Sequence, residues 1–278
     1  MVKKLYILTG AGISAESGLE TFSSSEGLWQ RYRTQDVATL GGWMRSPATV
    51  WQFTARLKAA ANSAEPNSAH FAVADTLKKF QTLGIDSVLV TQNIDTLHER
   101  ALELSGLDID HCIAMHGRLG ESRCMHCRMV WNDPFLHFDA DGVPSNASVS
   151  RIAFDPDLPV MEKRLFRVGE CLPISPCCKA LLRPNLVWFG EEPHELNRCF
   201  AEVQGTDVFV AIGTSGVVAP ASDFVKWATR LNKSARTIFV NVNGDDASPW
   251  FNEFRIGLAS AVVPQLFTEI CGSLSAKP

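Results

Sequence analysis

The feature that most constrains the fold is a short apolar run that ends at a glycine-rich turn near the start of the chain. Residues 5–8 read Leu-Tyr-Ile-Leu, and Thr9 is followed at once by Gly10, Ala11 and Gly12. A buried strand that runs directly into Gly-x-Gly brings backbone N–H groups close to an anion, because glycine permits the tight turn and the next helical end is electropositive. The next glycine comes about six residues later instead of three, so this is an irregular form of the dinucleotide fingerprint.

Further apolar runs alternate with helical patterns and extend this strand into a sheet. Strands are expected where β-branched runs end in polar residues or glycine, at residues 88–90, 208–212, 238–242 and 261–263. Helices are expected between them at residues 46–61, 68–83, 94–104 and 221–231. This alternation predicts an α/β fold, a Rossmann-like doubly wound parallel sheet.

Two regions interrupt the alternation and are predicted to form a smaller inserted domain. Residues 20–83 carry helical patterns without a convincing strand, and we expect a cofactor-binding loop and a helical module there. Residues 118–184 are rich in loops and cysteine, and we expect a zinc-binding module. The Rossmann-like nucleotide-binding domain then comprises residues 1–19, 84–117 and 185–278. A chain of 278 residues is long enough for one large domain and one small one.

Charge and hydropathy exclude several classes of partner. The 26 basic and 30 acidic residues give a net charge of −4, so the chain lacks the broad basic field that nucleic acid or anionic lipid requires. No apolar run approaches the ~20 residues that a membrane span needs, and the run after the basic start is too short for a signal peptide. We therefore expect a cytoplasmic monomer that binds neither nucleic acid nor membrane directly.

Five of the eight cysteines fall in the second insertion. Cys124 and Cys127 form a Cys-x-x-Cys knuckle, and after 43 further residues come Cys171 and the adjacent pair Cys177-Cys178. Four thiolates at ~2.3 Å from a zinc ion can fix a module that has little core of its own. We predict one structural zinc ion bound by Cys124, Cys127, Cys171 and Cys178, with Cys177 as the alternative to either later ligand. A redox pair, or a degenerate site that holds no metal, is the competing interpretation.

Five further motifs follow one another in a fixed order around this insertion. They are Thr91-Gln92-Asn93-Ile94-Asp95, Met115-His116-Gly117, the run from Leu182 to Glu191, Gly213-Thr214-Ser215 and Asn241-Val242-Asn243. With these motifs in this order, the chain resembles the sirtuins, the NAD-dependent protein-lysine deacylases, from about residue 5 to residue 265. The resemblance implies that NAD and an acyl-lysine protein or peptide enter a cleft from opposite sides.

The resemblance implies that His116 is the general base. In the family reaction the acyl oxygen attacks C1′ of the nicotinamide ribose and nicotinamide leaves. The histidine then deprotonates a ribose hydroxyl, and the products are free lysine, nicotinamide and O-acyl-ADP-ribose. A histidine with an ordinary pKa near 6.5 is competent for this step close to neutral pH.

The resemblance also assigns the residues that contact NAD and the substrate. Gln92, Asn93 and Asp95 surround the nicotinamide and its ribose, and Gln92 and Asn93 count as catalytic. The other cofactor-binding residues are Gly10, Ala11, Gly12, Ile13, Ser14, Glu16, Phe22, Gly213, Thr214, Ser215, Asn241 and Asn243. The substrate-binding residues are Val187, Trp188, Phe189, Gly190 and Glu191, which pair with the peptide as an added strand, and Ala38, Thr54 and Leu57 in the acyl pocket.

The chain departs from the family pattern in the cofactor loop and in the acyl pocket. Ser23 stands where the family has an arginine after the phenylalanine, which removes a cation near the pyrophosphate; Arg31 and Arg33 are the nearest replacements. The sequence is most similar to the class that removes acidic acyl groups and includes bacterial sirtuins. The Tyr-x-x-Arg pair of that class, however, falls on Thr54 and Leu57. We therefore expect neutral acyl groups to be removed faster than succinyl or malonyl groups.

Two alternatives to a deacylase remain open on sequence grounds. The altered cofactor loop is compatible with an ADP-ribosyltransferase or NAD glycohydrolase, although the presence of His116 argues against it. The loss of the loop arginine is equally compatible with a catalytically weakened, NAD-binding scaffold.

Overall fold

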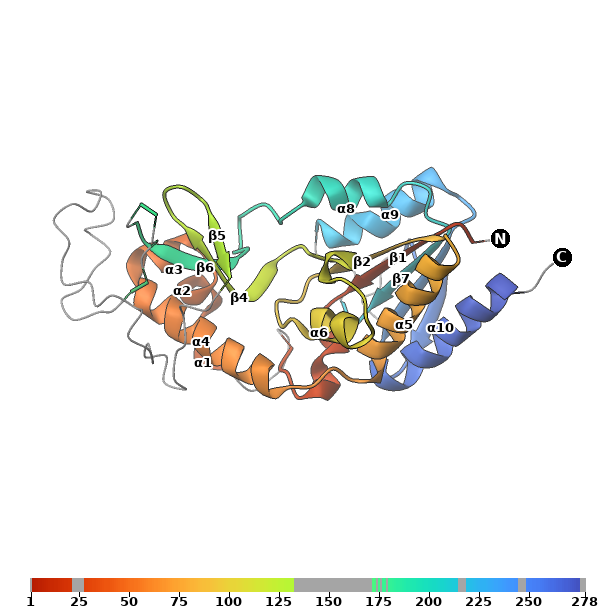
Figure 1. The fold of residues 1–278 in the computed structure, drawn as a ribbon, viewed down its shortest axis with the longest axis horizontal. Coiled ribbons are helices and arrows are strands. Elements are labelled where there is room, and N and C mark those ends of the chain that lie inside the picture. The colour runs from red at the N-terminus through yellow and green to blue at the C-terminus, as the bar shows by residue number, and fades with distance from the viewer. Residues whose placement is uncertain are drawn as a thin grey trace. The chain divides into compact units, whose positions relative to one another are not determined.

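The computed structural model describes residues 2–21, 28–132, 172–173, 175, 177–178, 180–214, 219–244 and 249–275. The chain divides into two units (Figure 1). Unit 1 comprises Met1–Phe22, Ala64–Met115 and Pro193–Pro278, and unit 2 comprises Ser23–Ser63 and His116–Glu192. Each unit has a hydrophobic core of its own.

Unit 1 is built on a six-stranded parallel sheet with the strand order β3-β2-β1-β7-β8-β9. The strands are β1 (Lys4–Thr9), β2 (Asp86–Thr91), β3 (Cys112–Ala114), β7 (Val208–Ile212), β8 (Arg236–Asn241) and β9 (Glu253–Ile256). The strand order reverses between β1 and β7, so the loops after these strands diverge there. Parallel α/β sheets bind ligands at such a switch point, beyond the carboxyl ends of the strands.

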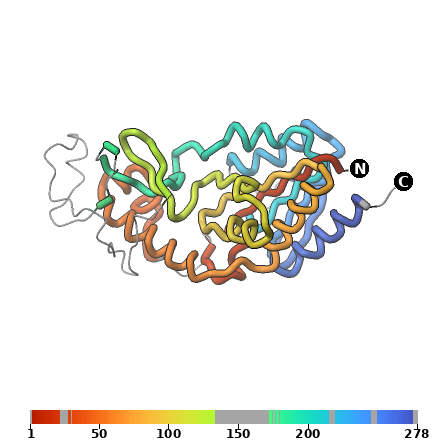
Figure 2. Tube along the Cα trace, viewed as in Figure 1, coloured from red at the N-terminus to blue at the C-terminus, as the bar shows by residue number. Residues whose placement is uncertain are grey.

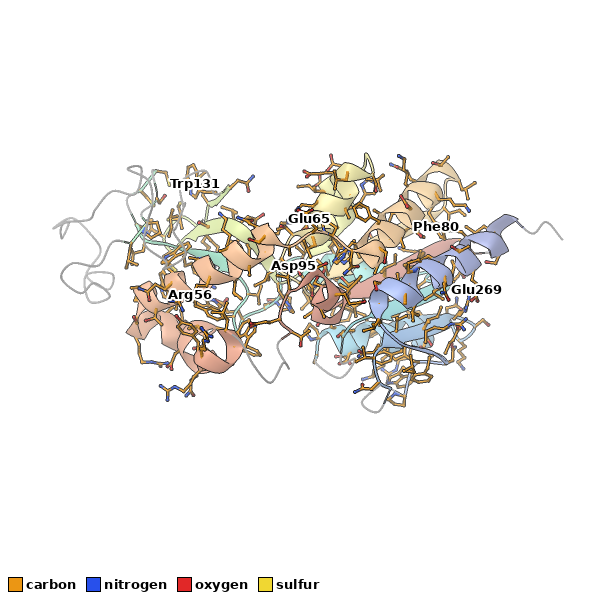
Figure 3. The ribbon with its side chains drawn as sticks, turned by 90° about the horizontal axis from the view of Figure 1, so that it is seen from below. Arg56, Glu65, Phe80, Asp95, Trp131 and Glu269 are labelled. Carbon is orange, nitrogen blue, oxygen red and sulfur yellow. The ribbon has the colours of Figure 1, made fainter. Side chains whose placement is uncertain are left out.

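Helices cover both faces of this sheet because its inner strands, such as β1 and β7, are apolar on both sides. Leu5 and Ile7 belong to one core cluster, whereas Tyr6 and Leu8 belong to the other, as the two-residue period of a strand requires. The first face is covered by α5 (Ser68–Thr82), α6 (Leu97–Leu104) and α10 (Ala259–Ser275), and the second by α8 (Leu196–Glu202) and α9 (Ala221–Leu231) (Figures 1 and 2). Phe80 on α5 and Glu269 on α10 are labelled in Figure 3, where these two helices run side by side.

In its described residues, unit 2 combines four helices with a three-stranded antiparallel sheet of order β5-β4-β6. The elements are α1 (Leu28–Arg31), α2 (Thr34–Val37), α3 (Leu40–Arg45), α4 (Pro47–Ser63), β4 (Gly117–Cys124), β5 (Val130–Asn132) and β6 (Leu182–Leu186). Trp43 and Phe53 from the helices share one buried cluster with Leu182 and Trp188 from the cysteine-bearing segment. The helical and cysteine modules are therefore parts of one unit with a common core.

The predicted fold class is confirmed, and several boundaries differ. The run 261–263 was expected to be a strand, but it lies in α10; the last strand is β9, at Glu253–Ile256. From the last residue of this run onward, buried apolar residues recur at helical spacing, at Val263, Leu266, Phe267 and Ile270. This helical period outweighs the strand preference of the β-branched residues.

The predicted module boundaries also differ from the two units of the structure. Helix α5 falls within the predicted helical module 20–83 but belongs to unit 1, because its apolar face packs in the core beneath β1 and β2. Residues 185–192 were expected in the Rossmann-like domain but belong to unit 2, where β6 pairs with β4. No helix among the described residues is long and apolar enough to cross a membrane.

Candidate active site

The glycine turn after β1 is locked against the turn after β7. The Gly12 N–H donates to the Gly213 carbonyl at 2.8 Å, and a Cβ placed on Gly12 would lie 2.7 Å from the Gly213 Cα. A Cβ on Gly10 would also lie 2.8 Å from the Gly213 carbonyl oxygen, and Gly213 itself has a φ of +61°, which favours glycine. Gly10, Gly12 and Gly213 therefore bring the turns after β1 and β7 together at the switch point of the sheet. Each of these turns is a candidate phosphate-binding site.

The residues that follow this turn enter the core or contact neighbouring helices. Ala11–Ile13 and Ala15–Ser17 form two short 3₁₀ turns. The Ile13 side chain is fully buried in the core of unit 1, so only its backbone can face a ligand. The Glu16 carboxylate accepts the Ser260 N–H at 2.8 Å and the Ser260 hydroxyl, and so ties this loop to the start of α10.

The segment after β2 reaches both turns through its side chains. Gln92 Nε2 donates to Thr214 Oγ1 at 3.0 Å, and Asn93 Nδ2 donates to Ser14 Oγ at 3.2 Å. Asp95, labelled in Figure 3, accepts the Leu97 N–H at 3.0 Å. Burial raises the pKa of the Asp95 carboxyl, against the opposing effect of its hydrogen bonds from Leu97 and the Ser14 hydroxyl. The structure thus brings the predicted residues of three separate motifs together at one edge of the sheet.

The residues predicted on the adenosine side lie beside the same edge. Asn241, the last residue of β8, donates from Nδ2 to the Thr214 carbonyl at 3.0 Å, and its Oδ1 accepts the Val242 N–H at 2.8 Å. Asn243 is exposed in the following loop. Phe22, Ser23 and Ser215 lie outside the described residues.

His116 is the first residue of the second segment of unit 2 and lies immediately before β4. Its side chain is half-buried, and its carbonyl oxygen accepts the Val187 N–H at 3.0 Å. Gly117 has a φ of +84°, and a Cβ there would overlap the Asn185 carbonyl oxygen. The glycine of the His-Gly pair is therefore required by the close approach of β4 and β6, which fixes the backbone next to the histidine.

The predicted peptide-binding segment 187–191 is held by a buried ion pair. Arg183 is 2% exposed and lies 3.3 Å above the Trp188 ring; it also donates to both Glu191 carboxylate oxygens, at 2.6 and 2.8 Å. Glu191 in turn accepts the Trp188 N–H at 2.9 Å. Burial alone would raise the pKa of Glu191, but Arg183 holds it below its ordinary value. The Trp188 and Glu191 side chains thus stabilise the segment itself. The sequence did not identify Arg183 as their partner, because a single arginine within an apolar motif forms no periodic pattern.

Phe189 is the predicted peptide-binding residue with the most accessible side chain, at 58% exposure. The Phe189 N–H donates to the Ala38 carbonyl at 2.9 Å, next to a parallel bridge between Thr39 and Phe189. The N–H groups of residues 187, 188, 189 and 191 all donate within unit 2, so an added peptide strand would have to pair with carbonyl oxygens of the segment.

The two positions that were expected to contact an acyl group lie one turn apart on helix α4. Leu57 packs against the core of unit 2, whereas Thr54 is buried and donates to the Val50 carbonyl at 2.9 Å. Arg56, labelled in Figure 3, lies with its guanidinium 5.9 Å from the centre of the Tyr32 ring. Arg33, a proposed replacement for the missing loop arginine, pairs with Asp36 at 2.7 Å.

A hollow between α4 and β4 was not predicted. Thr54 lines it together with Lys58 from the next turn of α4 and with Arg118, Glu121 and Ser122 from β4. Lys58 lies four residues after Thr54 and therefore shares its helix face, a relationship that helical periodicity could have revealed. The hollow thus has Lys58 on the Thr54 face of α4 and an ion pair between Arg118 and Glu121 on the β4 side.

Three of the predicted metal ligands converge in unit 2. The Sγ atoms of Cys124, Cys127 and Cys178 lie within 4.8 Å of one another, and the Cys124 and Cys178 sulfurs are 3.3 Å apart. Cys177 Sγ lies 3.3 Å from Cys127 Sγ, whereas Cys171 is outside the described residues. The Ala180 N–H helps to lower the pKa of Cys178 to about 6, whereas, against the effect of the Met129 N–H, the neighbouring thiols raise the pKa of Cys127 to about 12. Within this cluster, Cys178 is therefore favoured as the thiolate that a metal binds.

Comparison with known proteins agrees with this arrangement. The model of the Sir2 family matches residues 10–220. The NAD-dependent protein deacylase of Vibrio cholerae serotype O1 is 37% identical over 272 residues, which cover 96% of this chain and 93% of that protein. The NAD-dependent protein deacylase of Bdellovibrio bacteriovorus is 35% identical over 271 residues, which cover 97% of both chains.

Solved structures extend the similarity to three dimensions. A mutant Sir2 homologue in complex with ADP-ribose has a TM-score of 0.76 at 31% identity and covers 100% of this chain and 95% of its own. A Sir2 homologue–NAD complex has a TM-score of 0.73 at 31% identity, covering 99% and 91%. Sir2Af2 bound to a myristoylated histone peptide has a TM-score of 0.63 at 27% identity, covering 99% and 94%. With a family match over three quarters of its length and relatives that span almost all of it, the chain belongs to the Sir2 family, the sirtuins.

Proposed function

We infer that this chain is an NAD-dependent protein-lysine deacylase, which transfers the acyl group from lysine to ADP-ribose and releases nicotinamide. The observation that carries this function is the sheet edge of unit 1, where the Gly12–Gly213 contact joins two turns and Gln92 and Asn93 reach both of them. Two relatives named as NAD-dependent protein deacylases match this chain over more than nine tenths of both lengths, and the chain itself belongs to the Sir2 family. Transfer of ADP-ribose to protein, the alternative, is not favoured by these relatives.

We propose that NAD binds along this edge. Backbone N–H groups near Gly10, Gly12 and Gly213 would meet the pyrophosphate, since glycine lets the backbone approach an anion closely. Gln92, Asn93 and Asp95 would surround the nicotinamide ribose, and Asn241 would contact the adenosine ribose. Ser14 and Thr214 are already hydrogen-bonded to this set, so we expect them to orient these side chains. Solved relatives that hold NAD or ADP-ribose support this placement.

We propose His116 as the general base of the reaction. After nicotinamide has left, the His116 imidazole would take a proton from a hydroxyl of the same ribose, and that oxygen would attack the carbon of the acyl group. One water molecule would be consumed as the lysine amine leaves, which gives O-acyl-ADP-ribose and free lysine. The tight backbone at Gly117 and the Val187–His116 hydrogen bond would hold the base in place. The acyl-lysine peptide would lie along residues 187–191 with its stem against Phe189. A solved relative holds a myristoylated histone peptide, which supports an acylated peptide as the substrate class.

We propose that Cys124, Cys127 and Cys178 bind one structural zinc ion, with Cys171 or Cys177 as the fourth ligand. Among the described residues, these thiols gather where unit 2 joins β4 to β6. The ion would stabilise this connection and take no part in the chemistry, because a site closed by four protein ligands leaves no position for substrate. Free thiols at all described cysteines also support a cytoplasmic location, and we expect a monomer.

Incubation of the protein with NAD and an acetylated peptide, read by mass spectrometry, tests the function. A deacylase yields O-acetyl-ADP-ribose, nicotinamide and free lysine in equal amounts. His116→Ala should abolish formation of O-acetyl-ADP-ribose and free lysine while NAD still binds, as titration calorimetry would show. Nicotinamide leaves before the base acts, so its release alone does not test the base. ADP-ribosylated protein or free ADP-ribose without deacetylation would support a transferase or glycohydrolase, and NAD binding without products would support a scaffold. Near-normal turnover by the variant would show that another group is the base.

A further inference from the structure

The last strand of the unit 1 sheet exposes large apolar side chains on one face. On the face that α8 and α9 cover, the side chains of β1, β7 and β8 are buried, whereas Phe254 and Ile256 of β9 are 47% and 55% exposed. Arg255 between them points to the opposite face, where it pairs with Glu269 of α10 at 2.9 Å. Burial on the α9 face therefore ends at β8, and β9 extends beyond it.

Trp250 adds a third exposed apolar side chain to this face. It lies just before β9 and is 37% exposed. The Arg230 guanidinium of α9 is 5.8 Å from the centre of its ring, which places the indole on the α9 side of the sheet. Single exposed apolar residues are common on protein surfaces, but several that share one face mark an interaction site. We call Trp250, Phe254 and Ile256 the β9 patch.

The side of α9 that faces the β9 patch is positively charged. Arg230 contacts Trp250, and Lys226 lies one turn earlier on the same side of the helix. Asp223 lies 3.5 Å from Lys226 and offsets one of these charges. Within the part of the chain that the structure describes, Arg230 pairs with no carboxylate and contacts only the indole ring. A partner that covers the patch therefore has to bring acidic groups to this side.

We propose that the β9 patch is a docking surface for an acidic amphipathic helix of another protein. The helix would lie beside α9 and cover Trp250, Phe254 and Ile256 with its apolar stripe. Its carboxylates would pair with Arg230 and Lys226. A helix is the occupant that fits, because sheets of this class are covered by a layer of helices and the place next to α9 lies over β9.

The size and charge of the surface distinguish this partner from a second copy of the chain. Two copies that met at the patch would each bring Arg230 and Lys226 to the contact, and like charges at an interface are unfavourable. Tryptophan and arginine are the residues that contribute most to binding at interfaces. Three apolar side chains nevertheless form a small surface, so we expect a transient complex with micromolar affinity.

The patch is also separate from the candidate active site. Arg230 lies near the end of α9, and Trp250 lies before the start of β9, so their contact is at the amino end of the sheet. The edge that we propose for NAD is at the carboxyl ends of the strands. Substitution of Arg230 or Trp250 therefore alters docking without touching the residues that we assign to the chemistry.

Three synthetic peptides with a fluorescent label test the proposal. The first forms an amphipathic helix with leucine at heptad positions a and d and glutamate beside this stripe. The second has lysine in place of every glutamate. The third has the composition of the first in a scrambled order that forms no apolar stripe. Fluorescence anisotropy gives the Kd of each peptide, and the melting temperature of each protein variant is measured beside it.

We expect the wild-type protein to bind the glutamate peptide at least tenfold more tightly than the other two. Arg230→Glu should raise the Kd for the glutamate peptide about tenfold, the effect of one charge-assisted contact, and should lower the Kd for the lysine peptide. Phe254→Ser should also raise the Kd for the glutamate peptide, by about tenfold or more. Leu104→Ser is the matched control, because this leucine is 70% exposed on α6, on the opposite face of the sheet, and its loss should change no Kd.

The proposal is overturned if the wild-type protein binds none of the peptides or binds all three equally, or if Arg230→Glu and Phe254→Ser leave the Kd unchanged. A dimer in sedimentation velocity that Phe254→Ser dissociates would show that a second copy covers the patch. Binding to phosphatidylglycerol vesicles that the same variant loses would show that a lipid surface does. Either result would contradict a helical protein partner. If Phe254→Ser does not fold, the exchange of charge between Arg230→Glu and the lysine peptide decides alone.

Discussion

Gly12 and Gly213 lie so close that neither position has room for a side chain. A Cβ on Gly12 would lie 2.7 Å from the Gly213 Cα and 2.9 Å from its carbonyl oxygen, both of which are backbone atoms. These residues are about two hundred positions apart in sequence and belong to the loops after the two central strands, β1 and β7. The shape of the NAD-binding edge that we propose therefore depends on both loops at once.

Gly12→Ala should weaken NAD binding and lower stability together. Backbone atoms cannot move aside as a flexible side chain can, so the two loops have to separate, at a cost of about 1–3 kcal/mol for overpacking. The measurements are the Kd for NAD and the urea midpoint. Gly272→Ala is the matched control, because nothing lies within 4 Å of a Cβ in that part of α10. Alanine there should be neutral or stabilising. Wild-type affinity in Gly12→Ala would show that NAD does not depend on this contact.

The free energy of unfolding should fall as the pH is lowered from 6.5 towards 4. The pKa of His70 is about 4 in the folded protein because of burial, against 6.5 in the unfolded chain. The unfolded state binds more protons in this window, so acid favours unfolding, by about 3 kcal/mol for a shift of this size. Burial, together with the neighbouring His70, lowers the pKa of His98 as well and adds to the effect.

Urea titrations at pH 7 and pH 5 measure this dependence. His70→Asn should reduce the difference between the two free energies, because asparagine does not titrate. Asp95 acts in the opposite direction, since its raised pKa favours the folded state in acid and its contribution is lost as the pH rises through that pKa. An unchanged difference in the variant would mean that His70 is protonated in the folded state.

Glu191→Gln should destabilise unit 2 strongly. The substitution leaves the buried Arg183 guanidinium without its carboxylate, and breaking a buried pair from one side costs about 3–5 kcal/mol. Asp36→Asn is the control, because the paired Arg33 side chain is 76% exposed and such a pair contributes ~1 kcal/mol or less. Chemical denaturation gives both values. Equal losses in the two variants would mean that burial of Arg183 has no energetic consequence.

Purified protein should contain one zinc ion per chain, and Cys124→Ser should remove the ion and unfold part of unit 2. Elemental analysis and near-UV circular dichroism measure the two effects. Comparison of Cys171→Ser with Cys177→Ser identifies the fourth ligand, because only the ligand variant should lose metal. The short distance from Cys177 to Cys127 makes Cys177 a direct competitor. Full zinc content in Cys124→Ser would exclude the proposed site.

Neutral acyl groups should be removed faster than succinyl or malonyl groups. Leu57 packs in an apolar core and Thr54 donates its proton to the Val50 carbonyl, so neither supplies the cation that a carboxylate needs. The measurement is kcat/KM on one peptide that carries each modification. Lys58, on the Thr54 face of α4, provides the counter-test. A succinyl preference that disappears in Lys58→Met would show that this lysine binds the carboxylate and that our expectation is wrong.

The parallel sheet could be predicted because buried parallel strands are continuous apolar runs, as in β1, β2, β7 and β8. The start of α10 could not, because three β-branched residues look like a strand until the spacing of Leu266, Phe267 and Ile270 is included. The short strand β3 also gave no signal, since three residues hold too little pattern. Local sequence therefore revealed the long elements, and tertiary packing decided the short or ambiguous ones.

In the candidate site, the sequence identified the motifs but not what each residue contacts. Gly12 was assigned to cofactor binding, and Gly117 was noted only as part of a family motif. Both positions also require glycine because a Cβ there would collide with the backbone of another segment. Trp188 was counted among substrate residues, yet it is buried beneath Arg183. The contact of His70 with Ser14 was missed, because a lone histidine on an apolar helix face is indistinguishable from any buried histidine until its partners are known.

The central position of β1 affects how the chain acquires its structure during synthesis. β1 pairs with β2 on one side, but on the other it pairs with β7, which begins only at Val208. About two hundred residues separate β1 from β7 and must be synthesised before the middle of the sheet can close, and until then one edge of an apolar strand has no partner. Unpaired strand edges of this kind favour association between nascent chains. Formation of the β1–β7 pair should therefore be a late event, and the yield of folded protein should depend on chaperones that shield the N-terminal segment while the remainder is translated.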